Sequence, residues 1–207
     1  MKYTGFKAAC TVAVALTLMP VVAVAADSQH DFAVKGVGAL QCSAFLSFDQ
    51  KAEVYRDIAL ENWLLGYLTA ENRLAPDTYD VMAVQDPAIV SNVIIALCKS
   101  NPNATIEAVA ASFIKQLAPI KIDQNSPSLS INAGKNKVEI RKSTLVLVEK
   151  SLHEKKYYRG QADGKFSPEL QKSLEKFQKD QSLPITGLPD ADTIIRLLIE
   201  IPLKSGR

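Results

Sequence analysis

The chain has 207 residues, 47% hydrophobic and 22% charged, which is the balance of a globular protein with room for one medium domain or two small ones. Its 24 basic side chains against 22 acidic ones give a formal net charge of +2. Proteins that hold nucleic acid by neutralising phosphates carry a marked excess of basic residues, so the composition argues against a nucleic-acid partner.

The first 25 residues have the pattern of a secretory signal peptide. Two lysines precede an apolar centre over residues 8–22, and the small-residue sequence Ala-Val-Ala follows it. The alternative is a membrane anchor, but the apolar run is short for a bilayer span and contains Pro20. We therefore expect export to the periplasm, cleavage near Ala25 or Ala26, and no membrane span in the mature chain. That chain carries 22 basic and 22 acidic residues, because both lysines leave with the signal.

Two of the three cysteines belong to the expected mature chain. Cys10 lies in the signal peptide, whereas Cys42 and Cys98 remain in an oxidising compartment, where an even pair is most simply a disulfide. Reactive thiols or a metal site are disfavoured, because neither cysteine lies in a CxxC motif or beside a histidine. We expect a Cys42–Cys98 disulfide, no metal and no cofactor.

A long helix is predicted early in the mature chain. Ser47 and Gln50 have the spacing of a capping box, and the helix that it would start runs to about Asn72. It carries two apolar stripes on opposite sides, formed by Val54, Ile58, Leu65 and Leu68 and by Leu60, Trp63, Leu64 and Tyr67. Such a helix either lies centrally in its domain or exposes one side to a partner. We expect the central position.

Two further helices complete this region. Asp86-Pro87 is a well-formed start for the first of them, and Asn103 is the expected cap of the second. Apolar residues recur at helical spacing in both, as Val90, Val93, Ile94, Leu97 and Cys98 and as Ile106, Val109, Ala110, Phe113, Ile114 and Leu117. Residues 36–118 are thus predicted to form a disulfide-stapled helical domain.

The order of cysteines, aromatic residues and prolines in this region forms a recognisable pattern. It consists of Cys42, Phe45, Leu46, Trp63, Leu64, Gly66, Tyr67, Pro87, Ala88, Ile89, Val90, Cys98, Asn101 and Pro102. The pattern is similar to the HdeA-type periplasmic helical domain and to the Rap/Tai immunity-protein domains. It implies a small helical fold closed by one disulfide. The roles known in these families, acid-stress chaperoning and neutralisation of a secreted toxin, carry over to no residue beyond the cysteine pair and the aromatic helix.

Residues 119–143 change character and are predicted to link two domains. The segment is rich in Pro, Asn, Ser and Lys and lacks a long apolar period. Around Asn132-Ala133-Gly134, alternating Leu129 and Ile131 precede the turn, and Val138 and Ile140 follow it, as in a β-hairpin. A flexible spacer and an ordered hairpin both remain open.

Three short helices are predicted over residues 144–201. Ser143 or Thr144 caps the first, residues 168–181 form the second, and Asp190 or Asp192 starts the third. Their inward apolar residues are Leu145, Val148, Leu152, Leu170, Leu174, Phe177, Ile194, Leu197, Leu198 and Ile201. The expected fold class is therefore all-α, with two small helical domains joined by the linker.

This C-terminal region contains an ordered series of aromatic, glycine and polar residues over about 55 positions. The series is Leu152, Tyr157, Tyr158, Gly160, Asp163, Gly164, Phe166, Pro168, Leu174, Phe177, Gln178, Leu183, Thr186, Gly187, Asp190, Thr193 and Leu197. In this order it resembles the three-helix peptidoglycan-binding domain found beside cell-wall hydrolases. Glu149 departs from the family, which usually has Gln there, and Ser167 and Leu170 replace a Gly and a Thr. The resemblance implies the fold and peptidoglycan as a partner.

Aromatic faces and directional polar groups together recognise sugars and peptides. The candidate peptidoglycan contacts are Tyr158, Arg159, Asp163 and Gln178, whereas Tyr157 and Phe177 are expected in the core. The alternative is that the Gly-containing turns of this region only satisfy backbone geometry and that the tyrosines only fill the core.

No catalytic site is predicted. His30 and His153 share no metal motif, no nucleophile elbow is present, and no carboxylate pair stands out. The sequence therefore predicts an exported, non-enzymatic, cell-wall-associated protein that binds peptidoglycan and presents a helical domain to a protein partner. The alternatives are a periplasmic chaperone or immunity-type inhibitor tethered to the wall, and a hydrolase with an unrecognised site.

Overall fold

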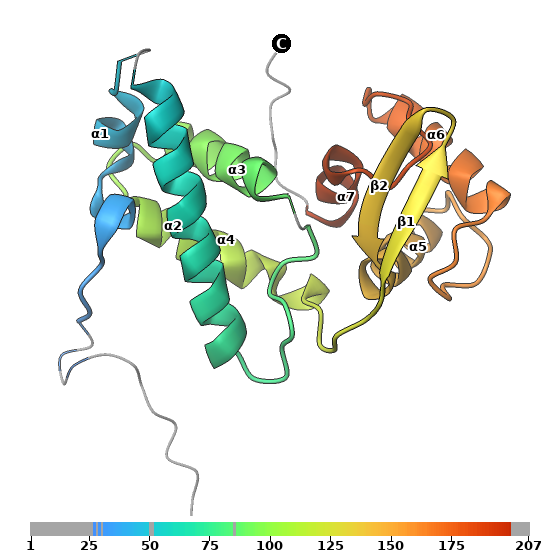
Figure 1. Ribbon diagram of the computed structural model, residues 1–207, viewed down its shortest axis with the longest axis horizontal. Coiled ribbons are helices and arrows are strands. Elements are labelled where there is room, and N and C mark those ends of the chain that lie inside the picture. Colours follow the sequence, from blue (N-terminus) through green and yellow to red (C-terminus); the bar gives the residue numbers. More distant parts are fainter. Residues whose placement is uncertain (1–26, 28, 30, 50–51, 85, 200–207) are drawn as a thin grey trace, which may run out of the picture. The chain divides into compact units, whose positions relative to one another are not determined.

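The computed structural model describes residues 27, 29, 31–49, 52–84 and 86–199 (Figure 1). The predicted signal peptide and Ile201 lie outside the described residues. The chain divides into two units, Met1–Ala33 and Val34–Arg207. Every element named below belongs to the second unit, so the separate domains predicted from the sequence stay a prediction. Among the described residues, no helix combines the length and the apolar character that a membrane span requires.

The first half of this unit is helical. Its elements are η1 (Gly36–Ala39), α1 (Cys42–Leu46), α2 (Glu53–Leu74), α3 (Pro87–Ser100), α4 (Ile106–Leu117) and η2 (Ala118–Ile120). The start of α3 is confirmed, because the Asp86 carboxylate accepts a hydrogen bond from the Ala88 N–H. The cap of α4 is Thr105, whose hydroxyl accepts from the Ala108 N–H, so the prediction of Asn103 as its cap is wrong.

The predicted capping box at Ser47 is also wrong. Ser47 follows the last turn of α1, where its hydroxyl donates to the Ala44 carbonyl and its N–H bonds back to the same turn. The chain then turns, and the Asp49 carboxylate accepts from the Ala52 N–H just before α2 begins at Glu53. The capping-box spacing is misleading here, because the short helix α1, which Cys42 ties to the core, ends just before Ser47.

The predicted disulfide is confirmed. Cys42 at the start of α1 is bonded to Cys98 near the end of α3, and both side chains are fully buried. Phe45, Ile94 and Ile106 fill the surrounding core and are almost inaccessible to solvent. The bond therefore fastens the short α1, which has few residues with which to bury itself, to a long helix.

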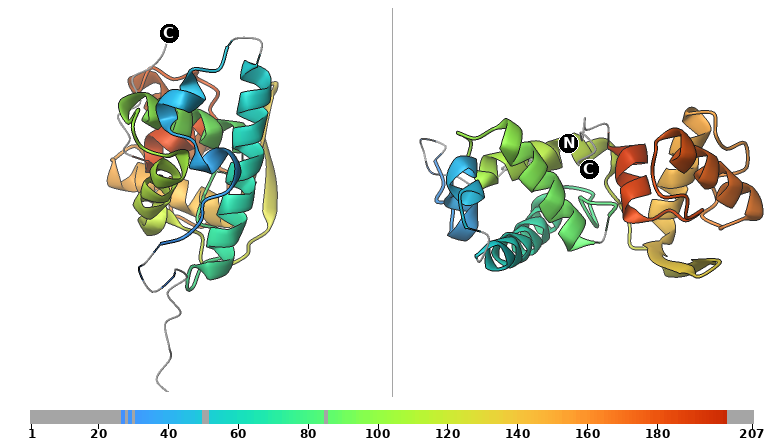
Figure 2. Two further views of the ribbon diagram at one scale, coloured as in Figure 1. Left: turned by 90° about the vertical axis from the view of Figure 1, so that its left-hand side faces the viewer. Right: turned by 90° about the horizontal axis from the view of Figure 1, so that it is seen from above.

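The expected central position of α2 is wrong. Leu60 and Leu64 are buried against the neighbouring elements, but Val54, Ile58 and Leu65 are 65%, 50% and 44% exposed. The helix passes in front of α3 and α4 in Figure 1, and the turned views of Figure 2 keep it on one side of them. One of its two apolar stripes therefore enters the core, whereas the other contributes only Leu68, which packs against the core from its edge.

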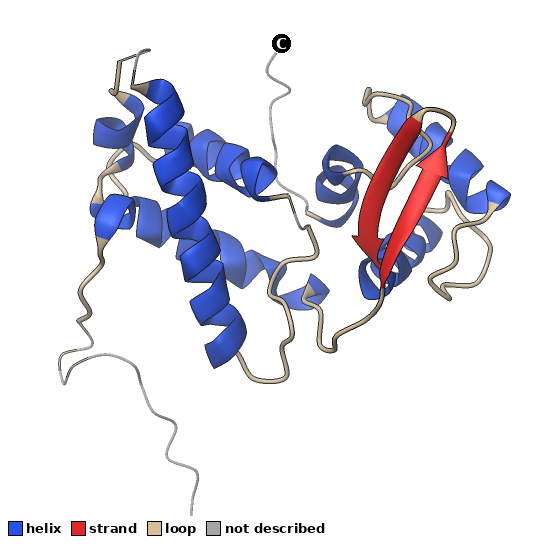
Figure 3. Cartoon of the chain, viewed as in Figure 1, coloured by secondary structure: helices blue, strands red, loops and turns tan. Residues whose placement is uncertain are grey.

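The chain is predominantly helical but not all-α, which corrects the predicted fold class (Figure 3). Strands β1 (Ser128–Ala133) and β2 (Asn136–Arg141) pair antiparallel, in a register from Ser128 opposite Arg141 to Ala133 opposite Asn136. Gly134 takes φ +60° in the two-residue turn between them. Of the two interpretations of this segment, the ordered hairpin is confirmed, and its buried Ile131 and Ile140 explain why it is ordered.

Three helices follow, α5 (Lys142–Glu154), α6 (Pro168–Asp180) and α7 (Ala191–Leu198). The expected start of α6 at residue 168 is confirmed, and so is the expected cap Asp190 of α7, whose side chain accepts from the Thr193 N–H. The cap of α6 is Ser167, whose hydroxyl accepts from the Leu170 N–H. The expected cap of α5 is wrong, because that helix continues directly from β2 and Thr144 lies inside it. The predicted inward residues that are buried here are Leu145, Val148, Leu152, Leu170, Leu174, Phe177, Ile194 and Leu197.

Replacing Cys42 and Cys98 together with alanine should lower the free energy of unfolding by about 4 kcal/mol, because the unfolded chain loses a cross-link that closes a long loop. The two positions are 56 residues apart in the sequence. Denaturant titration of the oxidised protein and the double variant measures the difference. Reduced wild-type protein is the control and should match the variant; equal stability of all three would contradict the structural role of the bond.

Candidate functional site

The loop between α5 and α6, residues 155–167, contains three of the four candidate contacts. Backbone hydrogen bonds tie its start to the end of α5, among them those from the N–H groups of Tyr157 and Tyr158 to the Leu152 carbonyl. The Tyr158 ring is only 6% exposed and lies so close to Gly160 that a Cβ there would meet its hydroxyl at 2.2 Å. Tyr158 therefore fills the loop from inside.

Arg159 and Asp163 lie at the outer side of the same loop. Arg159 is exposed, and Asp163 is half-buried. The Asp163 carboxylate accepts from the Lys165 N–H at 3.0 Å and pairs with the Lys165 ammonium at 2.8 Å. This ammonium lowers the pKa of Asp163, so the carboxyl keeps its negative charge. The loop thus presents a guanidinium and a carboxylate to solvent from a rigid turn.

A buried carboxylate holds this loop from beneath. Glu149 of α5 is fully buried, and its Oε2 accepts a hydrogen bond of 2.7 Å from the Gly164 N–H. Burial raises the pKa of Glu149, and the negative charge of Asp163 acts in the same direction, while the Gly164 N–H and Lys142 act against them. The other oxygen, Oε1, has no hydrogen-bond partner within the described part of the chain. Glu149 positions the loop at the cost of a poorly solvated charge.

Gly164 must be glycine in this arrangement. Its φ is +71°, and a Cβ would lie 2.6 Å from the Lys142 Cγ and 3.1 Å from the Lys142 carbonyl oxygen. The close approach of the loop to the first turn of α5 therefore depends on the missing side chain.

Gln178 of α6 lies in a different environment. Its side chain is fully buried, and its amide makes five hydrogen bonds to the turn that follows α6 and to α7. The Nε2 donates to the Thr186 hydroxyl, the Leu188 carbonyl and the Thr193 hydroxyl, each at 2.9 Å, and the Oε1 accepts from the N–H groups of Thr186 and Gly187. We call this set of contacts the Gln178 network.

Both the nitrogen and the oxygen of the Gln178 amide are thus hydrogen-bonded within the protein. A direct contact with a ligand would require these buried bonds to be broken, which costs more than a new bond returns. The structure therefore brings Tyr158, Arg159 and Asp163 into one loop and places Gln178 in the support of the next turn.

The two residues expected in the core behave differently. Phe177 is 2% exposed, as predicted. Tyr157 is only half-buried: its ring meets the Phe177 ring edge to face at 5.3 Å, and its hydroxyl donates to the Asp180 carboxylate. The Lys176 ammonium lies 4.7 Å from the Tyr157 ring centre, so one side of that ring is covered by a cation.

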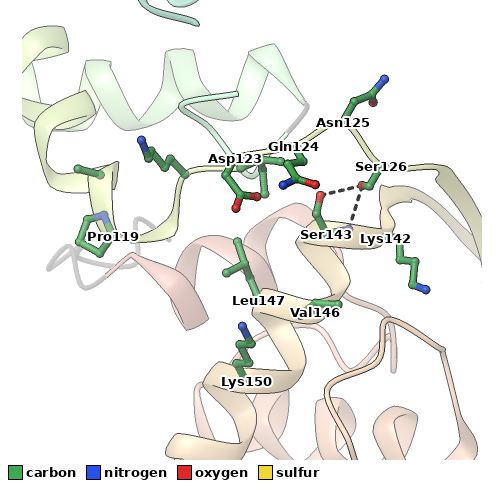
Figure 4. A pocket seen from close by; sticks show the side chains of 13 residues that line it. Pro119, Asp123, Gln124, Asn125, Ser126, Lys142, Ser143, Val146, Leu147 and Lys150 are labelled. Atoms are coloured by element: carbon green, nitrogen blue, oxygen red, sulfur yellow. Dashed lines mark hydrogen bonds between the residues drawn. The ribbon is translucent and has the colours of Figure 1, made fainter. Parts of the chain in front are cut away.

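Sequence reasoning missed a cleft of about 530 Å³ beside α5 (Figure 4). One side is formed by residues 118–126, and the other by the side chains of Val146, Leu147 and Lys150. The Ser126 hydroxyl accepts from the Ser143 N–H at 3.0 Å and fixes the segment to the first turn of α5. No sequence pattern marked this cleft, because its wall lies in the segment interpreted as a linker.

Replacing Gly164 with alanine should destabilise the protein by about 1–3 kcal/mol, because both the backbone conformation and the contact with Lys142 oppose a Cβ. Gly134→Ala is the matched control: Gly134 also has positive φ, but nothing lies within 4 Å of its Cβ position. Thermal unfolding should show the larger loss for Gly164→Ala. Equal losses would mean that the packing against α5 contributes nothing.

Replacing Glu149 with glutamine should raise the melting temperature near neutral pH. The folded pKa of Glu149 lies above the unfolded one, so protonation favours the folded state and this stability is lost as pH rises through the folded pKa. Glutamine has the same shape and no charge, and its advantage should shrink as pH falls towards about 4.3, the unfolded pKa of a glutamate.

Thermal unfolding across this pH range tests the sign. Glu154→Gln removes an exposed carboxylate from the same helix and is the control. A shift for Glu149→Gln that is independent of pH, or a lower melting temperature near neutral pH, would contradict the burial of a disfavoured charge.

Comparison with known proteins gives one family match. Residues 141–197 match the model of the family described as "Putative peptidoglycan binding domain". Two curated relatives, localization factor PodJL from the NA1000 / CB15N and the ATCC 19089 / CIP 103742 / CB 15 strains of Caulobacter vibrioides, are each 39% identical over 57 residues. Those residues are 28% of this chain and 6% of each relative. No solved structure matches. The similarity to a peptidoglycan-binding domain thus covers the α5–α6 loop and the Gln178 network.

Proposed function

We propose that the chain is a non-enzymatic protein of the bacterial cell envelope that binds peptidoglycan through residues 141–197. The family match over those residues is the observation that carries this proposal. The matched family is described by binding and not by catalysis. The name of the PodJL relatives, localization factor, is in keeping with a role in placing proteins rather than transforming substrates.

The proposed contacts lie on the outer side of the α5–α6 loop. Peptidoglycan offers carboxylates on its peptides and hydroxyl and amide groups on its sugars. The exposed Arg159 guanidinium suits a carboxylate, which it can bind with two parallel hydrogen bonds. Asp163 can accept from sugar or amide donors on the oxygen lone pairs that Lys165 leaves free.

In this proposal the other two candidates support the site. The Tyr158 ring is too deeply buried to stack on a sugar and keeps the loop filled, while Gln178 fixes the turn after α6. The charge of the region also favours an anionic ligand, since residues 141–197 contain eleven basic and eight acidic side chains.

Export is part of the proposal. The pattern of residues 1–25 predicts a cleaved signal peptide, and a buried disulfide suits the oxidising periplasm. Peptidoglycan is present in the same compartment. The signal-peptide pattern, the disulfide and the peptidoglycan-binding family match are therefore all consistent with a periplasmic protein.

The test is co-sedimentation of residues 27–207 with purified peptidoglycan sacculi. The protein should pellet with sacculi, and Arg159→Ala should weaken binding at least tenfold, because it removes the hydrogen bonds to a charged group. The melting temperature should not change, because Arg159 is exposed. Lys172→Ala, which removes an exposed positive charge from α6, is the matched control and should bind as the wild type does.

Failure of the wild-type protein to pellet would refute the proposal. Release of soluble muropeptides from the sacculi would instead identify a hydrolase. Equal losses in the Arg159 and Lys172 variants would indicate a general charge effect and remove Arg159 from the site.

A further inference from the structure

The outer face of α2 carries apolar side chains that the fold does not use. Val54, Tyr55, Ile58 and Leu65 are 65%, 76%, 50% and 44% exposed. They lie on the side of the helix away from the buried Leu60 and Leu64. We call these four residues the α2 ridge. Single exposed apolar residues are ordinary, but four on two adjoining strips of one helix are a typical interaction surface.

A groove of about 440 Å³ runs beside the first turns of α2. Its lining is almost entirely apolar, and Tyr55 belongs both to the groove and to the ridge. Phe45 forms its buried floor, and Phe48, 47% exposed, lies at its edge. The groove is completed by Val37, Leu40 and Ala59. The ridge and the groove thus form one continuous apolar surface.

The only cation in the described lining of this groove is already neutralised. The Arg56 guanidinium lies over the Phe45 ring at 5.2 Å, and its side chain is 7% exposed. It pairs with the carboxylates of Glu53 at 2.9 Å and Asp57 at 2.7 Å. These bonds hold Arg56 inward and fix the two acids beside the ridge.

The charge around the surface is negative. Residues 49–61 contain four acidic and two basic side chains, and residues 34–120 contain nine acidic and six basic ones. The Glu53 and Asp57 side chains remain 50% and 42% exposed, so they are available to a partner. An apolar surface with an acidic border complements an apolar surface with a basic border.

We propose that the α2 ridge and groove bind an amphipathic helix of another protein whose apolar side is bordered by lysine and arginine. Apolar side chains one turn apart on that helix fill the groove and pack along the ridge, in the helix-in-groove mode. Its basic residues meet Glu53, Asp57 and Glu61. The surface shares no residue with 141–197, so the proposal does not depend on peptidoglycan binding.

A second copy of the chain is a poorer occupant. In a two-fold pair the same surface appears on both sides, so the acidic border of Glu53, Asp57 and Glu61 on one copy would face the same acidic border on the other. Such like charges oppose association. The acidic border therefore selects a partner of opposite charge.

The probe is a labelled helical peptide with leucine at i, i+4, i+7 and i+11 and lysine on both borders. Fluorescence anisotropy with residues 27–207 should give saturable binding, and a peptide with glutamate in place of lysine should bind at least tenfold more weakly. Backbone amide NMR shifts should change along α2 and around Phe48, and not in residues 141–197.

Ile58→Ser should weaken binding about tenfold, because it removes an exposed apolar contact without touching the core. Leu74→Ser is the matched control: Leu74 is 68% exposed, but lies at the other end of α2, outside the ridge. Glu61→Lys should weaken binding of the lysine peptide and strengthen binding of the glutamate peptide.

Several results would overturn the proposal. They are absence of binding by the lysine peptide, equal binding of both peptides, and equal effects of Ile58→Ser and Leu74→Ser. Concentration-dependent dimerisation that Ile58→Ser abolishes would assign the surface to a second copy of the chain instead.

Discussion

The region that matches a binding family is organised around one buried amide. The helices α6 and α7 are short, and they can pack on α5 only if the turn between them has a fixed shape. The side chain of Gln178 reaches out of α6 and supplies both donors and acceptors to that turn. Because the amide is buried, each bond is worth more than it would be in water, and an incomplete set would be costly. The polar network therefore specifies one arrangement where apolar packing alone would permit several.

The α5–α6 loop depends on a second buried polar group of a different kind. Glu149 fixes Gly164 as Gln178 fixes the next turn, but it does so with an ionisable side chain. A glutamine at position 149 would supply a neutral donor and acceptor, whereas the carboxylate brings a charge. The loop that carries Arg159 and Asp163 is thus coupled to a titratable group, whereas the Gln178 side chain is itself uncharged.

Sequence patterns that act within one helix predicted much of the secondary structure. Features that depend on contacts between distant residues were not predicted. The caps at Asp86 and Asp190 were predictable because each acts within one turn of its own helix. The start of α2 was not, because a capping-box spacing at Ser47 coincides with the end of α1, which the distant Cys98 holds in place. Periodicity found both apolar stripes of α2 correctly but cannot tell which stripe meets the core. Similarly, the sequence around Gln178 singles out this residue, but it does not tell whether the side chain contacts a ligand or is buried and stabilises a turn.

Total charge is a poor guide to the partners of this chain, because it does not show where the charges lie. Its expected mature form is neutral, which excludes a strongly basic or acidic role, yet the charges are unevenly distributed. Acidic residues predominate in residues 34–120 and basic ones in residues 141–197. Exposed charges act over about 10 Å at moderate salt, so each region presents its own sign to a partner. A neutral protein can therefore attract an anionic polymer with one part and a cationic helix with another. On α2 the acids stay available to such a helix, because the ion pairs with Arg56 leave the Glu53 and Asp57 side chains 50% and 42% exposed.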